Sequence, residues 1–219
     1  AKKNHRRRGQ DEDDDRHEQW HTTTDTDGLT HEKRFHAKIA ANYVDFFVTR
    51  TNNVSYAKGI MSGKTLITAL HAWDPTSKYD LDPKFRNVPS ISYTFTRADG
   101  QQCTVSAADI AACPAYRPDR DDLVYVDLEN CPGFYTAAFP SLQKYIPEHL
   151  DINTIARDSK VYHDGLTQYI KYEGRDTYSD LEQTGVRTYM RFFGIAKKGQ
   201  SGSAILAYNQ KTQRGYLLG

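Results

Sequence analysis

Residues 65–73 read Thr-Leu-Ile-Thr-Ala-Leu-His-Ala-Trp, an apolar run that we interpret as a β-strand with His71 at its end. Similar segments surround it, rich in β-branched and aromatic residues and bounded by turn signals. Short strands at such intervals favour a barrel or a sandwich. The strands predicted around the first are Tyr43 to Thr49, Val54 to Met61, Ile91 to Thr96, Gln102 to Ser106 and Leu123 to Leu128.

A second series of strands follows a break at Cys131-Pro132-Gly133. A short helix is predicted at Phe139 to Tyr145, where the chain crosses over. The strands predicted beyond it are Ser159 to His163, Leu166 to Tyr172, Val186 to Phe193, Ala204 to Tyr208 and Tyr216 to Leu218. We therefore expect an all-β protein with an N-terminal β-barrel at 35–130, an inter-barrel connection at 131–150 and a C-terminal β-barrel at 151–219.

Two further motifs carry chemistry. Asp122 directly precedes the apolar alternation Leu-Val-Tyr-Val of residues 123–126, which predicts an aspartate at the start of a strand. Residues 199–203 read Gly-Gln-Ser-Gly-Ser, and glycines around a small hydroxyl residue let backbone N–H groups crowd round the carbonyl that the hydroxyl attacks. Ser201 is thus a candidate nucleophile, with an oxyanion hole formed at Gly199, Gln200 and Ser201.

The order histidine, aspartate, serine is that of the chymotrypsin triad, and it places the active site in the cleft between the two β units. In this interpretation His71 takes the proton of Ser201 during acyl transfer and Asp122 orients the imidazole. Each motif alone has a simpler explanation: a serine between glycines is common in turns, and the histidine could belong to the core. The acid could also be Asp121 or Asp127.

Composition excludes little beyond this. The 219 residues carry 29 basic and 28 acidic side chains, so no global field singles out a nucleic acid or a membrane as the partner. Three cysteines, an odd number without C-x-x-C spacing, predict neither a disulfide framework nor a zinc site and fit a reducing compartment. No apolar run reaches the roughly 18 residues of a membrane helix. We expect a soluble chain that needs no metal or organic cofactor.

Residues 1–34 differ from the rest of the chain, because a basic block and a run of five acids, Asp11 to Asp15, are followed by a polar stretch. Such a segment buries too little apolar area to offset the entropy of ordering it, and we expect a flexible charged tail. Contact of Arg6-Arg7-Arg8 with RNA is the alternative to a purely solvated role. The histidines in and beside this tail lack the spacing of a metal site.

The motifs resemble those of the 3C and 3C-like proteases, the chymotrypsin-like processing enzymes of picornaviruses and picorna-like viruses. Residues 66–71 resemble the catalytic histidine strand of that family, residues 121–126 its acidic strand and residues 198–203 its G-x-C-G block. The resemblance implies a chymotrypsin-like double β-barrel that processes a viral polyprotein in the host cell cytoplasm, cutting after glutamine. The connection near residues 133–142 faintly resembles a region that binds RNA in some relatives.

The chain departs from the family pattern in two respects. Ser201 stands where the family has cysteine, either as a natural serine variant or as a replacement that traps an inert form, and the two nucleophiles need different activation. Residues 215–219 resemble the strand that precedes the histidine specific for glutamine, so we expect that histidine and the final strand or strands of the second barrel to follow Gly219. Ala196 occupies the place of an assisting threonine.

Two other functions stay open from the residues alone. One is a serine protease of another viral lineage, such as the sobemovirus or astrovirus type, without glutamine preference. The other is a catalytically inactive β module that binds RNA or a viral partner, which predicts salt-sensitive RNA binding and no cleavage. The sequence carries no signal for an oligomeric state. His163, in a predicted turn, is the other core histidine considered for the specificity pocket.

Overall fold

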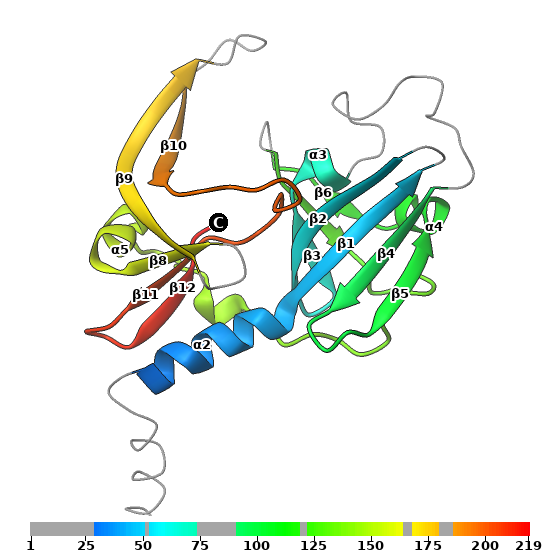
Figure 1. Cartoon of the computed structure of the whole chain (residues 1–219), viewed down its shortest axis with the longest axis horizontal. Helices are drawn as coiled ribbons and strands as arrows, with labels where there is room; N and C mark the ends of the chain where they lie inside the picture. Colours follow the sequence, from blue (N-terminus) through cyan, green and yellow to red (C-terminus); the bar gives the residue numbers. More distant parts are fainter. Residues whose placement is uncertain (1–28, 51–52, 74–90, 119–121, 164–167, 180–185) are drawn as a thin grey trace, which may run out of the picture.

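Two antiparallel β-sheets and one long helix make up the computed structural model of the chain (Figure 1). The structure describes residues 29–50, 53–73, 91–118, 122–163, 168–179 and 186–219. Within these ranges, the helices are too short or too polar to cross a membrane. The predicted loop at 74–89 and most of the predicted tail lie outside the described residues.

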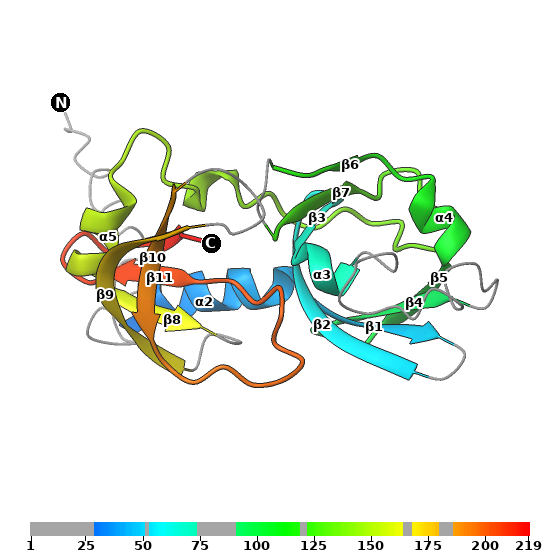
Figure 2. The ribbon, with the colours of Figure 1, turned by 90° about the horizontal axis from the view of Figure 1, so that it is seen from above.

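The first sheet has seven strands in the order β5-β4-β1-β2-β3-β7-β6, all paired antiparallel. Figure 2 shows it folding back, so that β6 and β7 lie across from β1 and β4. The strands are β1 (Tyr43–Arg50), β2 (Asn53–Ser62), β3 (Thr65–Thr68), β4 (Ser92–Arg97), β5 (Gln102–Ser106), β6 (Ala115–Tyr116) and β7 (Val124–Asp127).

Alternation of apolar residues explains why this sheet curls. Val44, Phe46 and Val48 of β1 are almost fully buried, while Asp45 between them is exposed. They share one core with Phe95 of β4 and Val126 of β7, on the opposite side of the fold. When a sheet curves so that side chains of its apolar face pack against one another, that face is buried without a second layer of structure. The core therefore lies inside the curled sheet.

Short helices close this unit. α3 (Leu70–Trp73) directly follows β3, and α4 (Ala107–Ala111) begins where the Ser106 hydroxyl accepts the N–H of Asp109 at 3.1 Å. Beyond β7 the chain crosses to the second unit through the 3-10 helix η2 (Gln143–Tyr145), shorter than the helix predicted over residues 139–145.

The second sheet has five antiparallel strands in the order β10-β9-β8-β11-β12. β9 and β10 form a long hairpin that curves away from the others, with a register shift between Arg191 and Phe192 (Figure 1). Helix α5 packs against β9 and β11, and the Asp151 carboxylate caps its first turn by accepting the Asn153 N–H at 3.0 Å. The elements are α5 (Ile152–Asp158), β8 (Lys160–His163), β9 (Gln168–Ser179), β10 (Val186–Phe193), β11 (Leu206–Asn209) and β12 (Arg214–Leu217).

Helix α2 (Leu29–Asn42) joins the two units. Its apolar residues Phe35 and Ile39, one turn apart, enter a core that includes Ile60 of β2 and Leu206 of β11. The close approach requires Gly215 in β12, because a Cβ there would lie 2.3 Å from the Phe35 ring. The predicted flexible tail at 1–34 is therefore wrong for its last residues, since the helix begins at Leu29.

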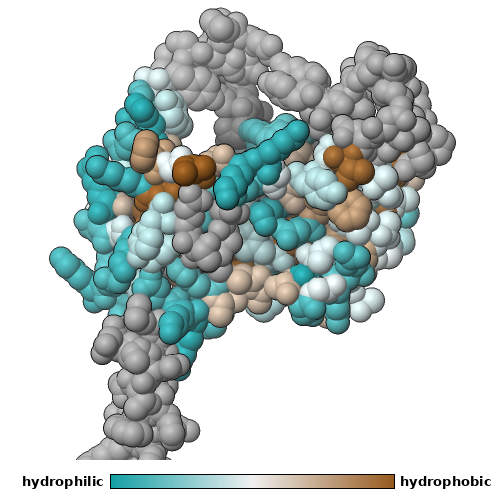
Figure 3. Space-filling model, in the orientation of Figure 1, coloured by the Kyte–Doolittle hydropathy of each residue, from teal (hydrophilic) through white to brown (hydrophobic). Residues whose placement is uncertain are grey.

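The all-β prediction with two successive β units is confirmed by the two sheets. Four details differ. His71 lies in a helix rather than at a strand end, and β9 runs to Ser179 instead of ending near Tyr172. The helices α2, α4 and α5 and the two-residue strand β6 were not predicted. Among the described residues, neither sheet pairs its two edge strands. Hydrophobic residues form only a few separate patches on the face shown in Figure 3, as expected when most apolar side chains are inside.

Candidate active site

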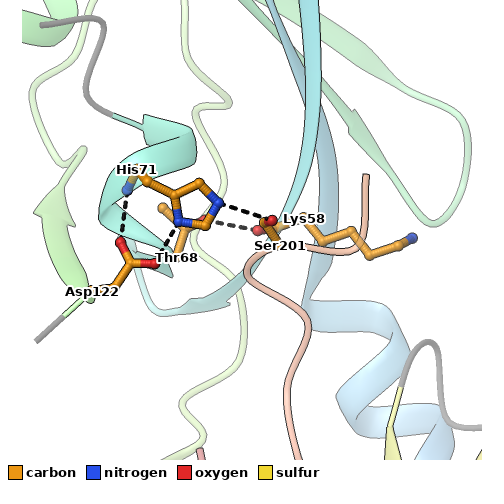
Figure 4. Close-up of polar contacts among 5 residues, drawn as sticks. All are labelled: Lys58, Thr68, His71, Asp122 and Ser201. Carbon is orange, nitrogen blue, oxygen red and sulfur yellow. Dashed lines mark hydrogen bonds and ion pairs between the residues drawn. The ribbon is translucent and has the colours of Figure 1, made fainter. Parts of the chain in front are cut away.

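His71 projects from α3, a single helical turn fixed from below by the core. Ala72 and Trp73 are buried, and the Trp73 carbonyl accepts the hydroxyl of the buried Tyr93 at 2.7 Å. The Trp73 N–H returns to the Ala69 carbonyl at 3.1 Å. With its neighbours held in this way, the half-buried His71 is turned toward the second unit (Figure 4).

Asp122 lies two residues before β7 and binds His71 through both of its carboxylate oxygens. Oδ1 accepts the His71 backbone N–H at 2.8 Å, and Oδ2 contacts the ring nitrogen Nδ1. The Asp122 carbonyl also accepts the Leu70 N–H at 3.3 Å, which ties the start of α3 to this segment. A carboxylate at Nδ1 places the ring proton there and leaves Nε2 as an acceptor.

Ser201 comes from the second unit, in the turn between β10 and β11. Its Oγ lies 3.1 Å from His71 Nε2, within hydrogen-bonding distance (Figure 4). The turn needs glycine on both sides, because φ is +87° at Gly199 and +88° at Gly202. The structure therefore brings the three residues together as Asp122, His71 and Ser201 in line.

The turn is anchored internally by Gln200. Its N–H donates to the Lys197 carbonyl at 3.2 Å, its side-chain oxygen accepts the Lys197 N–H at 2.8 Å, and its carbonyl accepts the Ser203 N–H at 3.0 Å. The expectation that Gln200 shares in the oxyanion hole is thus corrected, since its N–H is used within the turn. Within the described part of the chain, the N–H groups of Gly199 and Ser201 donate to no protein acceptor.

The same turn is also attached to the first unit. The N–H of Lys58, in β2, donates to the Ser201 carbonyl at 2.8 Å, and the Lys58 carbonyl accepts the Thr68 hydroxyl at 2.8 Å. Neither residue was predicted to belong to the site. Thr68 stands inside the quoted histidine segment, but a backbone contact at Lys58 has no signature in the sequence.

Solvent reaches the acid–base pair. The His71 side chain is 39% exposed and that of Asp122 is 56% exposed. A cavity of about 510 Å³ adjoins the pair, lined by Thr68, Asp122 and Ser203 together with apolar residues of both units. Asp122 and the chain neighbours of the other two residues line it, whereas His71 and Ser201 themselves do not.

The three cysteines lie elsewhere, in and around the core of the first unit. Cys131 is buried, and desolvation, the neighbouring Cys113 and nearby Asp109 raise the pKa of its thiol to about 12. Burial also raises the pKa of Cys103, against the opposing effect of Tyr135. Both are therefore protonated, unreactive thiols near neutral pH. Among the described residues there is no group of three or more metal-ligating side chains.

The arrangement has the parts of a nucleophilic site: a hydroxyl, a base within reach of it and a carboxylate that orients the base. His163, considered for a specificity pocket, is the last residue of β8, and Ala196 is exposed in the loop after β10. The other acids considered differ: Asp127 ends β7 and binds the Glu129 N–H at 2.9 Å, while Asp121 lies outside the described residues.

No family model and no curated protein matches the sequence. Among solved structures, tobacco vein mottling virus protease is similar at 12% identity and a TM-score of 0.44, over 78% of this chain and 68% of that one. An inactive tobacco etch virus protease complexed with substrate matches at 12% identity and a TM-score of 0.47, over 83% and 72%. A human pathogenic astrovirus serine protease matches at 13% identity and a TM-score of 0.36, over 76% and 75%.

Proposed function

We propose that the chain is an endopeptidase that acts by acyl transfer, with His71, Asp122 and Ser201 as its catalytic residues. The observation that carries the proposal is the position of His71, whose two ring nitrogens face Asp122 and the Ser201 hydroxyl. Three side chains from three separate segments, in both β units, converge on this one line. A satisfied core histidine needs no such partners.

The mechanism follows from this geometry. Ser201 Oγ attacks the carbonyl carbon of a peptide bond while its proton passes to His71 Nε2. Asp122 stabilises the resulting imidazolium, and the N–H groups of Gly199 and Ser201 are the donors for the oxyanion. His71 then gives the proton to the leaving amine. Water, deprotonated by the same histidine, hydrolyses the ester and frees Ser201.

An extended peptide is the substrate that suits the surroundings. β10 is an edge strand of the second sheet, and it runs directly into the loop that carries Ser201. An edge strand offers unpaired backbone groups to which an extended peptide can add as a further strand. We propose a viral polyprotein in the host cell cytoplasm as that substrate, with cleavage after glutamine; both rest on the resemblance of residues 66–71 and 198–203 to the 3C group.

The nucleophile is proposed to be the serine that the sequence contains. Serine depends on a base during attack, whereas cysteine is partly ionised near neutral pH. The contact of His71 Nε2 with Ser201 Oγ supplies that base. A serine protease of another viral lineage is the close alternative, and it differs in its preference at the cleaved residue.

The test is cleavage of peptides with glutamine or another residue before the scissile bond, by the chain and by Ser201→Cys, Ser201→Ala and His71→Ala. Cleavage by the parent that is lost in both alanine variants supports a natural serine peptidase. Cleavage only by Ser201→Cys would make the serine an inert replacement. Failure of both nucleophiles on every peptide would overturn the proposal, and indifference to glutamine would remove that preference.

A second candidate function, RNA binding, is favoured by a basic groove beside α2. A concave surface of about 430 Å³ lies between α2, η2 and β12, and no aspartate or glutamate lines it. The Lys144 ammonium also lies 5.0 Å from the Tyr145 ring centre. Phosphates and bases prefer such mixtures of cations and rings. The exposed cations of the groove are Arg34, Lys38, Lys144 and Arg214.

Titration with a single-stranded RNA at several salt concentrations tests this candidate. Binding that weakens steeply with salt, and that falls in Lys38→Ala combined with Arg214→Ala, supports it. Equal binding by the double variant would contradict the groove as the site.

A further inference from the structure

The backbone of the nucleophile turn is held by a residue that does not touch the reacting atoms. We propose that Thr68 is a positioning residue: through Lys58 it fixes the place of Ser201 relative to His71. The inference rests on the peptidase activity proposed above. Its basis is a chain of two hydrogen bonds, from the Thr68 hydroxyl to the Lys58 carbonyl and from the Lys58 N–H to the Ser201 carbonyl, each 2.8 Å long.

The register of the first sheet explains why Lys58 is free to make these bonds. β2 pairs with β3 from Ser62 opposite Thr65 to Gly59 opposite Thr68, and there β3 ends. In an antiparallel strand the N–H and C=O of one residue point to the same side. Lys58 is the first residue of β2 beyond the end of β3, so its two backbone groups on that side need other partners. The Ser201 carbonyl and the Thr68 hydroxyl are those partners.

Thr68 is enclosed where this occurs. It is 1% exposed, so water cannot replace the hydrogen bond between its hydroxyl and the Lys58 carbonyl. Loss of that bond would leave a buried polar group unsatisfied, which costs free energy. In Figure 4 the Thr68 side chain overlaps the His71 ring, and a dashed line joins it to the Lys58 backbone. A valine at this position would fill nearly the same volume and would leave the Lys58 carbonyl without its donor.

Gly202 shows how closely the two units approach here. A Cβ on Gly202 would lie 1.9 Å from the Lys58 carbonyl oxygen and 2.5 Å from Thr68 Oγ1. The residue after the nucleophile is therefore packed directly against the pair that holds the nucleophile. The three segments that carry Lys58, Thr68 and Gly202 therefore meet here without room for a side chain at position 202.

The consequence concerns the distance between base and nucleophile. Thr68 precedes His71 by three residues on the segment that carries the base, and through Lys58 it also governs the carbonyl of Ser201. The segment from Thr68 to His71 thus positions both atoms of the 3.1 Å contact, His71 Nε2 directly and Ser201 Oγ through Lys58. A displacement on the order of 1 Å in such a site can lower the rate about 100-fold.

The experiment compares the full chain with Thr68→Val, Thr68→Ser and Thr94→Val. Thr94 is the matched control, a buried threonine in β4 whose hydroxyl bonds Thr104 at 3.0 Å, away from the site. We expect kcat on a cleaved peptide to fall at least about 10-fold in Thr68→Val, with KM unchanged, since only the attack geometry is altered. Thr68→Ser, which keeps the hydroxyl, should recover most of kcat, and Thr94→Val should match the parent.

A second measurement does not depend on activity. Hydrogen exchange of the Lys58 amide, followed by NMR, should become faster in Thr68→Val and stay slow in Thr68→Ser and Thr94→Val. If the parent cleaves nothing while the exchange follows this pattern, the peptidase proposal fails and the contact stands. If Thr68→Val keeps the parent's kcat, or if its Lys58 amide is as protected as in the parent, the positioning role is overturned.

Discussion

Asp122 accepts two hydrogen bonds from the same residue, one from the backbone N–H of His71 and one from its ring. The backbone bond fixes the carboxylate to the second residue of α3, and the ring bond then fixes the imidazole to the carboxylate. His71 can therefore rotate about its side-chain bonds only by breaking the second bond. With both of its oxygens engaged by His71, the Asp122 carboxylate holds the imidazole in one orientation.

Replacing this acid gives a first prediction. In Asp122→Asn an amide N–H would replace one carboxylate oxygen, so the ring tautomer needed for catalysis is no longer favoured. We expect kcat for peptide cleavage to fall about 10⁴-fold, with the fold retained. Asp127→Asn, at an exposed acid five residues further along the chain and at the end of β7, is the control and should keep its activity. A larger loss in Asp127→Asn than in Asp122→Asn would reassign the acid.

A second prediction concerns the collision at Gly202. Alanine there combines the strain of a positive φ with direct overlap on Lys58, so the nucleophile turn must separate from the first unit. We expect loss of cleavage activity and a lowered Tm, measured by calorimetry. Gly100→Ala is matched in backbone angle, at φ +86°, but meets nothing within 4 Å. It should cost about 1 kcal/mol of stability and leave kcat unchanged; similar behaviour of the two variants would refute the packing argument.

The buried hydroxyl of Tyr93 provides a third prediction. It donates to the Trp73 carbonyl at the end of α3, below His71. Tyr93→Phe leaves that carbonyl unsatisfied, and we expect the free energy of unfolding in denaturant to fall by about 1–3 kcal/mol. Tyr116→Phe removes a hydroxyl from an exposed ring on β6 and should change the stability far less. If Tyr93→Phe and Tyr116→Phe unfold at the same denaturant concentration, the hydrogen bond from Tyr93 to the Trp73 carbonyl does not stabilise the fold as expected.

Acid should destabilise the fold through His36, a fourth prediction. Burial lowers the pKa of this residue below its ordinary value of 6.5, and nearby Glu32 opposes the shift only in part. At pH values above 6.5, His36 is neutral in both the folded and the unfolded chain, so its contribution to the free energy of unfolding is fully present. As the pH falls below it, the unfolded chain takes up the proton first and stability is lost.

His36→Phe removes the titrating group while keeping an aromatic ring against Tyr162, whose ring centre lies 4.5 Å away. We expect the decrease in Tm between about pH 7.5 and about pH 5.5 to become smaller in this variant. His31→Gln, at an exposed position of the same helix, should leave the decrease as it is. An unchanged slope in His36→Phe would exclude this residue as the source.

Thiol chemistry gives a fifth prediction, on the Ser201→Cys variant. Burial raises the pKa of Cys131 to about 12, so that thiol reacts slowly with iodoacetamide at neutral pH. A cysteine at position 201 would face His71 Nε2 and lose its proton to it. We expect alkylation, located by peptide mass mapping, to be faster at position 201 than at Cys131 or Cys103. The further change His71→Ala should slow it, and rapid labelling of Cys131 would contradict the structure.

Strand positions were largely predictable from the sequence, because β1, β5 and β10 pair apolar alternation with clear turn signals. The sequence also indicated the three side chains that the structure brings into contact, since His71 and Asp122 flank strands and Ser201 lies in a glycine-containing turn. α2 was missed because polar side chains dominate it and only Phe35 and Ile39 enter the core. Its helical form depends on a surface that both units create, and no local pattern reports such a surface.

The end of β3 was misplaced for a related reason. Residues 65–70 are uniformly apolar or β-branched, which favours a continued strand up to His71. The chain turns into α3 because Ala72 and Trp73 must be buried beneath it and Asp122 binds the N–H groups of Leu70 and His71. Those contacts are far apart in sequence. The same holds for Lys58, whose part in the site arises only from where β3 stops.

The packing of α2 also affects the order in which the chain folds during translation. Phe35 contacts Gly215, and its core includes Tyr208, so the helix is completed by segments that are synthesised long after it. During translation the helix must wait, its apolar face uncovered, until β11 and β12 have left the ribosome. Under the proposed function, peptide cleavage by a nascent chain would wait until β11 and β12 have been made.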